Sequence, residues 1–310
     1  GLSEDVEAIQ DFYGAKGYID ADVLPIKIPN VENSTIDLVY QIDEASKSYV
    51  EKIEIRGNTK TRDKVIRREL AIMPGEVFDM TRVKLSKRRL EGLRYFSKVD
   101  PQTEPTDIPD RKNLVINVEE QDTANFMIGA GFSTVDNLFG YAEVSQSNFD
   151  LFKPPYFMGG GQRMRLRATI GTERQDYILS FVEPWLFGRK LSLSTDVYWR
   201  RINYYSDEYE EDILGGKVGL SKTLWNDFWI GSIAYSLEDV NIRNVTSEAP
   251  YVIKQDQGHN LISKFMPSIA YDTRNSTMLP NHGQRTEFMP QIAGPFGGDF
   301  NFYKLELRTA

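Results

Sequence analysis

The chain has 310 residues, of which 40% are hydrophobic, 12% aromatic and 26% charged, and its formal net charge is -8. This aromatic content is too high for a disordered chain, and the acidic balance argues against nucleic-acid binding through bulk charge. The chain has no cysteine, which excludes disulfides and thiolate metal sites, and it has no apolar run long enough for a transmembrane helix.

Residues 1–47 predict one helix followed by two short strands. Apolar residues recur at helical spacing as far as Tyr13. The strands are expected over Asp20–Ile26 and Ser34–Ile42, separated by a turn at Asn30–Asn33. Since the chain starts inside a helical pattern and stops inside a strand pattern, we expect it to be a fragment of a longer protein.

Residues 48–121 predict a complete unit with the order β-α-α-β-β. Asp79 is expected to cap the second helix, and Phe96 is expected on the apolar face of that helix. Residues 1–47 resemble the last three elements of this unit, which indicates a weak internal repeat. The elements of the complete unit are expected as a strand at Tyr49–Arg56, helices at Thr61–Ala71 and Met80–Phe96, and strands at Lys98–Glu104 and Asn113–Glu119.

Residues 122–310 differ from the preceding part because their apolar residues alternate with polar ones instead of following a helical period. Arg163, Arg165 and Arg167, for example, alternate with Met164, Leu166 and Ala168. We expect about ten such strands, near 125–134, 138–148, 161–172, 176–183, 188–202, 210–223, 227–242, 259–273, 284–294 and 301–310.

Strands with one apolar face and one charged face fit two structures. One is a soluble antiparallel sheet with a core face and a wet face, and the other is a membrane barrel with lipid outside and water inside. The length of these strands favours the barrel, because soluble strands are usually half as long. Connections that alternate between short and long also favour it.

Aromatic residues near the strand ends suit the two girdles of a membrane barrel, although ordinary core packing explains some of them. These residues are Trp185, Trp199, Tyr204, Tyr205, Trp225 and Trp229.

Five short motifs, in order along the chain, resemble one family. The run LEGLRYFSKV at 90–99 resembles the end of a POTRA domain. NFMIGAG at 125–131 and YAEVSQSNFD at 141–150 resemble the first barrel hairpin of BamA-type outer-membrane assembly proteins. FVEPWLFG at 181–188 resembles a periplasmic turn of that family, and DTRN at 272–275, with Pro280 and Gly283, resembles another of its motifs.

The resemblance implies an α+β part made of POTRA domains, followed by an antiparallel transmembrane β-barrel. We expect the end of one POTRA domain at 1–47, a complete one at 48–121 and the start of the barrel at 122–310. The chain departs from the family in having only about ten strands, fewer than a complete barrel. The arginine motif of the family's extracellular loop and its closing strand have no counterpart here.

The function implied by this resemblance is non-enzymatic: unfolded outer-membrane proteins are received by the POTRA domains and inserted into the outer membrane of a diderm bacterium. Implied partners are these clients, accessory assembly lipoproteins and outer-membrane lipid, with no cofactor, no metal and no nucleic acid. Strand addition at an exposed sheet edge is the physical basis of such a function.

Four groups of residues are candidate sites. The first is a client-strand gate at the first barrel strand, where two glycines suit a strand that opens: Asn125, Phe126, Met127, Ile128, Gly129, Ala130 and Gly131. The second is a basic row facing the barrel interior, either solvated or in contact with acidic residues: Arg163, Arg165 and Arg167.

The third candidate is a structural turn in which Asp272 and Arg274 pair locally, with Pro280 and Gly283. The fourth is a basic helix face in the complete POTRA domain, which either binds an accessory lipoprotein or is simply solvated: Lys84, Lys87, Arg88 and Arg89.

Two other functions stay open. A two-partner secretion pore, which exports one exoprotein, would share the fold. A soluble periplasmic protein that binds or hydrolyses carbohydrate is the alternative from another class, with Glu210, Glu211 and Asp212 as catalytic carboxylates. Adjacent residues of a strand point to opposite faces, which argues against catalysis by this trio.

Overall fold

The computed structural model describes residues 1–30, 35–134, 137–203, 208–275 and 280–310. They form two compact units: Gly1–Thr123 with Tyr156–Gly160, and Ala124–Pro155 with Gly161–Ala310. The expected turn at Asn30–Asn33 and the aromatic residues Tyr204 and Tyr205 lie largely or wholly outside the described residues.

The first unit contains two sheets and three helices. A two-stranded antiparallel sheet pairs β1 with β2, and a three-stranded sheet has the order β3-β5-β4, with β3 parallel to β5. The order β-α-α-β-β expected for the complete unit is confirmed. The elements are α1 (Leu2–Gly14), β1 (Asp22–Asn30), β2 (Thr35–Asp43), β3 (Tyr49–Arg56), α2 (Asp63–Arg67), α3 (Met80–Leu93), β4 (Phe96–Pro105) and β5 (Arg111–Glu120).

The core of this unit lies between the helices α2 and α3 and the three-stranded sheet. It includes the fully buried side chains of Val50, Ile66, Phe78 and Leu90. The Asp79 side chain caps α3 as expected, accepting hydrogen bonds from the N–H groups of Thr81 (2.8 Å) and Arg82 (3.2 Å).

Two boundaries of the helices differ from expectation. The helix expected over Thr61–Ala71 is only Asp63–Arg67. It begins late because the Arg62 backbone is extended (φ -64°, ψ 138°), and beyond its end the Ala71 N–H donates to Ser86 Oγ instead of to a helix carbonyl. Phe96 is not on a helix face, because Arg94 is left-handed (φ 59°) and ends α3, so that Phe96 begins β4.

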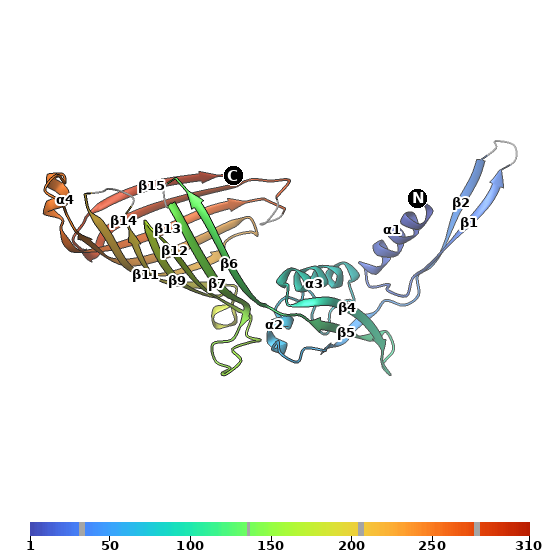
Figure 1. The fold of residues 1–310 in the computed structure, drawn as a ribbon. Coiled ribbons are helices and arrows are strands. Elements are labelled where there is room, and N and C mark those ends of the chain that lie inside the picture. The colour runs from blue at the N-terminus through green and yellow to red at the C-terminus, as the bar shows by residue number, and fades with distance from the viewer. Residues whose placement is uncertain (31–34, 135–136, 204–207, 276–279) are drawn as a thin grey trace. The chain divides into compact units, whose positions relative to one another are not determined.

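The second unit is one antiparallel sheet of ten strands in sequential hairpin order, from β6 at one edge to β15 at the other, as expected. Figure 1 shows this sheet curling instead of lying flat. Its strands are β6 (Ala124–Ser133), β7 (Asn137–Phe149), β8 (Gln162–Gly171), β9 (Arg174–Glu183), β10 (Ser192–Ile202), β11 (Glu210–Thr223), β12 (Trp229–Arg243), β13 (Gly258–Asp272), β14 (Arg285–Gly298) and β15 (Phe302–Thr309).

One face of this sheet is apolar and exposed. The pairing register places five apolar residues side by side across five strands, and each is exposed: Phe126, Val144, Leu166, Leu179 and Val197. The next row, on the opposite face, is polar: Ser145, Arg165, Ser180, Asp196 and Lys217. So continuous an apolar surface is unsuited to water and suits contact with lipid.

The polar face is the more enclosed of the two. Its side chains include several that are buried, such as Glu143, Asp176, Tyr198 and Ser236. Side chains crowd together on the inside of a curled sheet and spread apart on its outside. The polar face is therefore the concave one, which is where the arginine row was expected.

The expected alternation of short and long connections holds only in part. At one end of the strands, the short connection 224–228 lies on the same side as the long connection 150–161. At the other end, where long connections were expected, only residues 172–173 join β8 to β9. Two long connections have structure of their own. Residues 156–160 belong to the first unit, where the Arg62 N–H donates to the Gly159 carbonyl. The connection 244–257 contains the short helix α4 (Tyr251–Gln255).

Aromatic rings gather toward the two strand ends. Trp229 contacts Trp225 (6.1 Å between centroids) and Tyr271 (4.9 Å) near one end, and Trp199 lies 5.6 Å from Tyr177 closer to the other. In the described part of the chain, none of the helices has the length and apolar character needed to cross a membrane.

Candidate functional site

The strand β6 is an edge of the sheet. In the described residues it pairs only with β7, in an unbroken register that opposes Gly129 to Tyr141. The side chains of Phe126 and Ile128 are 65% and 72% exposed. A strand with one unpaired backbone edge and an apolar outer face can accept a further strand.

The backbone groups that are free at this edge follow from the register. The carbonyl oxygen of Gly129 points toward β7, since it lies only 3.7 Å from where a Cβ of Gly140 would be. In an antiparallel strand, the N–H and C=O of one residue point to the same side, and successive residues alternate. The N–H and C=O groups of Phe126, Ile128 and Ala130 therefore point to the open edge.

The two glycines of β6 make room for aromatic rings of β7. A Cβ at Gly129 would lie 2.5 Å from the ring of Tyr141, and one at Gly131 would lie 2.7 Å from the ring of Phe139. The same arrangement recurs further along the sheet, where Tyr198 covers Gly215. These glycines thus have a packing role on the concave face, beyond any weakening of the edge strand.

The arginine row has mixed surroundings. Arg167 lies 3.8 Å from the carboxylate of Glu143, and its guanidinium lies 5.0 Å from the ring centroid of Tyr141. Arg163 and Arg165 are exposed. Both interpretations of the row therefore apply, one residue being in contact with an acidic neighbour and two being solvated.

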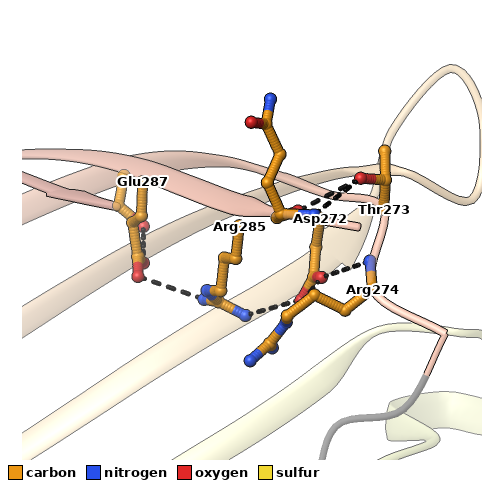
Figure 2. Close-up of polar contacts among 7 residues, drawn as sticks. Asp272, Thr273, Arg274, Arg285 and Glu287 are labelled. Atoms are coloured by element: carbon orange, nitrogen blue, oxygen red, sulfur yellow. Dashed lines mark hydrogen bonds and ion pairs between the residues drawn. The ribbon is translucent and has the colours of Figure 1, made fainter. Parts of the chain in front are cut away.

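The turn after β13 is organised around Asp272, as Figure 2 shows. Its carboxylate accepts hydrogen bonds from Nε (2.9 Å) and Nη2 (2.8 Å) of Arg274 and from Nη1 of Arg285 (3.2 Å), and Arg285 also contacts Glu287. Gly283 has φ +95°, and a Cβ there would collide with the backbone of Thr273. The arrangement orders the turn and contains no group poised for chemistry.

The basic face of α3 is partly occupied by contacts within the chain. Lys84 Nζ lies 2.7 Å from Asp11 of α1, and Lys87 lies 3.9 Å from Glu91 one turn along the same helix. Arg88 is exposed and Arg89 is half-buried. Lys84 therefore joins the two POTRA-like parts of the chain.

A carboxylate site at the end of β5 was not predicted from the sequence. Glu120 accepts hydrogen bonds from the N–H groups of Thr59 (2.9 Å), Lys60 (2.8 Å) and Thr61 (2.6 Å) and from the Thr59 hydroxyl (2.8 Å). Burial by itself would raise the pKa of Glu120, but these hydrogen bonds hold the pKa below its usual value. The residues that it binds lie far away in sequence, so no local pattern could identify it.

A second network that the sequence did not reveal lies on the concave face. Tyr198 donates a hydrogen bond to Glu238 (2.5 Å), and Glu238 also pairs with Lys264 (2.7 Å). This partly buried polar chain links β10 to β12 and β13 across the intervening strand β11, which helps to fix the register of these strands.

The carboxylates considered for catalysis do not form a site. Asp212 pairs with Arg201 (2.8 Å), and Glu210 pairs with Arg243 (3.2 Å), while Glu211 points to the other face. Nor do any three potential metal-ligating side chains gather in the part of the chain that the structure describes.

The β-α-α-β-β domain and the long strands with an apolar convex face define an outer-membrane barrel protein with POTRA domains. The family models agree: the Omp85 superfamily domain matches residues 157–310, and the POTRA model (surface antigen variable number repeat) matches residues 1–45 and 48–121. The chain belongs to the Omp85 superfamily and is of the BamA type, as the resemblance predicted.

Two relatives support this assignment. Outer membrane protein assembly factor BamA of Nitratidesulfovibrio vulgaris is 28% identical over 304 residues, which are 98% of this chain and 37% of that protein. The crystal structure of BamA from Haemophilus ducreyi lacking POTRA domains 1–3 matches with a TM-score of 0.81 and 21% identity, over 99% of this chain and 60% of the other.

CdiB from Acinetobacter baumannii shares the fold more distantly, with a TM-score of 0.52 and 15% identity over 99% of this chain and 56% of that one. The chain spans 37% of the length of the Nitratidesulfovibrio vulgaris relative. Its family places the ten-stranded sheet in the outer membrane and the POTRA part in the periplasm, as expected.

Proposed function

We propose that this chain is part of a non-enzymatic protein that assembles β-barrel proteins into the outer membrane. The BamA-type family membership supports this function. The single observation that carries the mechanism is the second edge of β6, where the N–H and C=O groups of Phe126, Ile128 and Ala130 point away from β7 beside an apolar exposed face. A client strand that pairs there gains backbone hydrogen bonds, while its own apolar side chains meet lipid.

The POTRA part offers a second edge. The sheet order β3-β5-β4 leaves one edge at β3 and one at β4. The β3 edge is partly covered, because Val50 exchanges backbone hydrogen bonds with Gly75 and Glu76. We propose that β4 receives an extended client by strand addition before the client reaches the barrel. We also propose domain boundaries at residues 47 and 121, with Arg88 and Arg89 left for an accessory lipoprotein.

The two-partner secretion pore is the weaker candidate. The BamA structure matches this chain with a TM-score of 0.81, against 0.52 for CdiB. A pore would need its lumen open and its barrel closed, whereas assembly needs the edge of β6 to separate from its neighbour. The two functions therefore make different demands on the same strand.

A reversible lock on β6 tests the proposal. In the full-length protein, a cysteine at Ile128 is joined by a disulfide to one on the strand that pairs with β6 in the closed barrel. We expect the lock to stop insertion of a barrel client into proteoliposomes and reductant to restore it. A locked protein that inserts clients at the normal rate would refute the gate, and undiminished export of a single exoprotein would favour the pore.

A further inference from the structure

A hollow on the concave face carries an excess of positive charge. Its volume is about 320 Å³, and side chains from β7, β8 and β9 line it, chiefly Arg165, Arg167, Arg174 and Asp176, with Phe139 and Ile178. All of these residues lie on the same face of the sheet by register. We call this cavity the arginine hollow.

The acidic residues in and around the arginine hollow are already shared among several arginines. Asp176 is 4% exposed, and its carboxylate contacts both Arg174 (2.7 Å) and Arg200 (3.3 Å). Glu143 lies 3.8 Å from Arg167. Arg165 makes no ion pair with any residue that the structure describes, and its guanidinium is exposed to the hollow.

Several other cations on this face are paired with carboxylates, whereas Arg163 is exposed and solvated. Lys264 pairs with Glu238 at 2.7 Å, and Arg274 and Arg285 share Asp272. The arginine hollow differs from these paired sites because it gathers Arg165, Arg167 and Arg174 around one buried carboxylate, that of Asp176. A planar guanidinium held beside a second one is suited to a carboxylate, because both can donate paired hydrogen bonds to it.

The walls of the arginine hollow restrict the class of ligand further. Phe139 and Ile178 add apolar surface beside the arginines. The hollow opens on the face opposite the exposed apolar rows of Val144, Leu166 and Leu179, so a lipid headgroup in the surrounding membrane does not reach it. A polypeptide segment can carry an acidic side chain next to an apolar one and can lie in the barrel interior.

We propose that the arginine hollow binds an acidic polypeptide segment, with a carboxylate between Arg165 and Arg167 and a neighbouring apolar side chain against Phe139 and Ile178. The volume is at the lower end of ordinary ligand sites and suits one or two side chains. The site is separate from the β6 edge, so that a segment bound here is held inside the barrel while the edge is free.

The full-length protein in detergent micelles tests this proposal. The probe is a fluorescent peptide of alternating Glu and Phe, and the control peptide has Gln in place of each Glu. We expect the Glu peptide to bind, the Gln peptide not to bind, and added salt to weaken binding. Arg165→Gln should weaken binding about tenfold or more, whereas the matched variant Arg163→Gln, on the same strand and face but outside the hollow, should change it about twofold at most.

Equal binding of the two peptides, or an equal effect of Arg165→Gln and Arg163→Gln, would overturn the proposal. Displacement of the peptide by inorganic phosphate at equal concentration would also overturn it, because the hollow would then take any small anion. Heat-modifiable gel mobility shows that each variant is folded. The assay requires no client insertion, so a failure of the proposed gate and a failure of this site are distinguishable.

Discussion

Ile128→Pro is the sharpest perturbation of the β6 edge. Proline removes the N–H of residue 128, which points away from β7 to the open edge, and leaves the N–H groups of Met127 and Gly129 in the β6–β7 ladder. The variant should therefore keep the pairing of β6 with β7, because that ladder loses no donor. Only the strand that pairs with the other edge of β6 should lose a hydrogen-bond donor.

The size of the effect follows from that lost partner. A client carbonyl left without its donor costs about 1–3 kcal/mol, and the proline ring at the edge adds a steric cost to close pairing. A total of about 3 kcal/mol corresponds to a roughly hundredfold fall in the population of the paired state. Ile128→Val keeps the donor and a β-branched side chain, so we expect it to behave like the unmodified protein.

The assay is insertion of a barrel client into proteoliposomes by the full-length protein, scored by the gel shift of the folded client. Met127→Pro is the matched control, because the same substitution one residue earlier removes an N–H that points toward β7 and should destabilise the barrel itself. Normal insertion by Ile128→Pro would refute the assignment of this edge as the working surface. So would equal loss of barrel stability in the two proline variants.

Three further predictions concern the two faces of the barrel sheet and the Glu120 site. Val197→Arg places a charge on the convex face, where Val197 is 51% exposed, and should destabilise the barrel by about 2–4 kcal/mol if it lies near the membrane midplane. Arg163→Gln on the opposite face should have little effect on barrel stability. Equal outer-membrane levels of the two variants would contradict the assignment of faces. Gly215→Ala puts a Cβ 2.5 Å from Cζ of Tyr198 and should lower the free energy of unfolding by about 1–3 kcal/mol, measured by thermal unfolding. The double variant with Tyr198→Ala should lose less stability than the sum of the two single changes. Glu120 has a lowered pKa, so its stabilising effect is present above the unfolded pKa of about 4.3 and is lost as the pH falls through the lower folded value. Glu120→Gln should accordingly lower the melting temperature of the helical circular-dichroism signal at neutral pH, and the difference should shrink in acid; a constant difference across this range would show that the charge of Glu120 is not what stabilises the site.

The sequence by itself determined the order of elements and the two faces of the barrel sheet. Alternation in 163–170 assigns Arg165 and Leu166 to opposite faces, because successive residues of any strand point in opposite directions. Asp79 was identified as a helix cap for a similar reason: the donors that it binds, at Thr81 and Arg82, are two and three residues away. Such properties depend on local geometry alone.

Tertiary structure decided which residues meet across distant parts of the chain. Glu120 binds residues about sixty positions earlier, and Lys84 is neutralised by Asp11 from another helix, so that no periodic pattern could reveal either contact. The C-terminal side of the helix expected over Thr61–Ala71 was shortened for the same reason, since the Ala71 N–H bonds to the Ser86 side chain from another helix.

The β6 strand shows both kinds of determination. Its motif and its place as the first barrel strand were readable from residues 125–131. The packing role of Gly129 and Gly131 could not be predicted from these residues, because it depends on the rings of Tyr141 and Phe139 in the facing strand. Which N–H groups face the open edge was likewise fixed only by the register with β7, since a shift of one residue would reverse every donor.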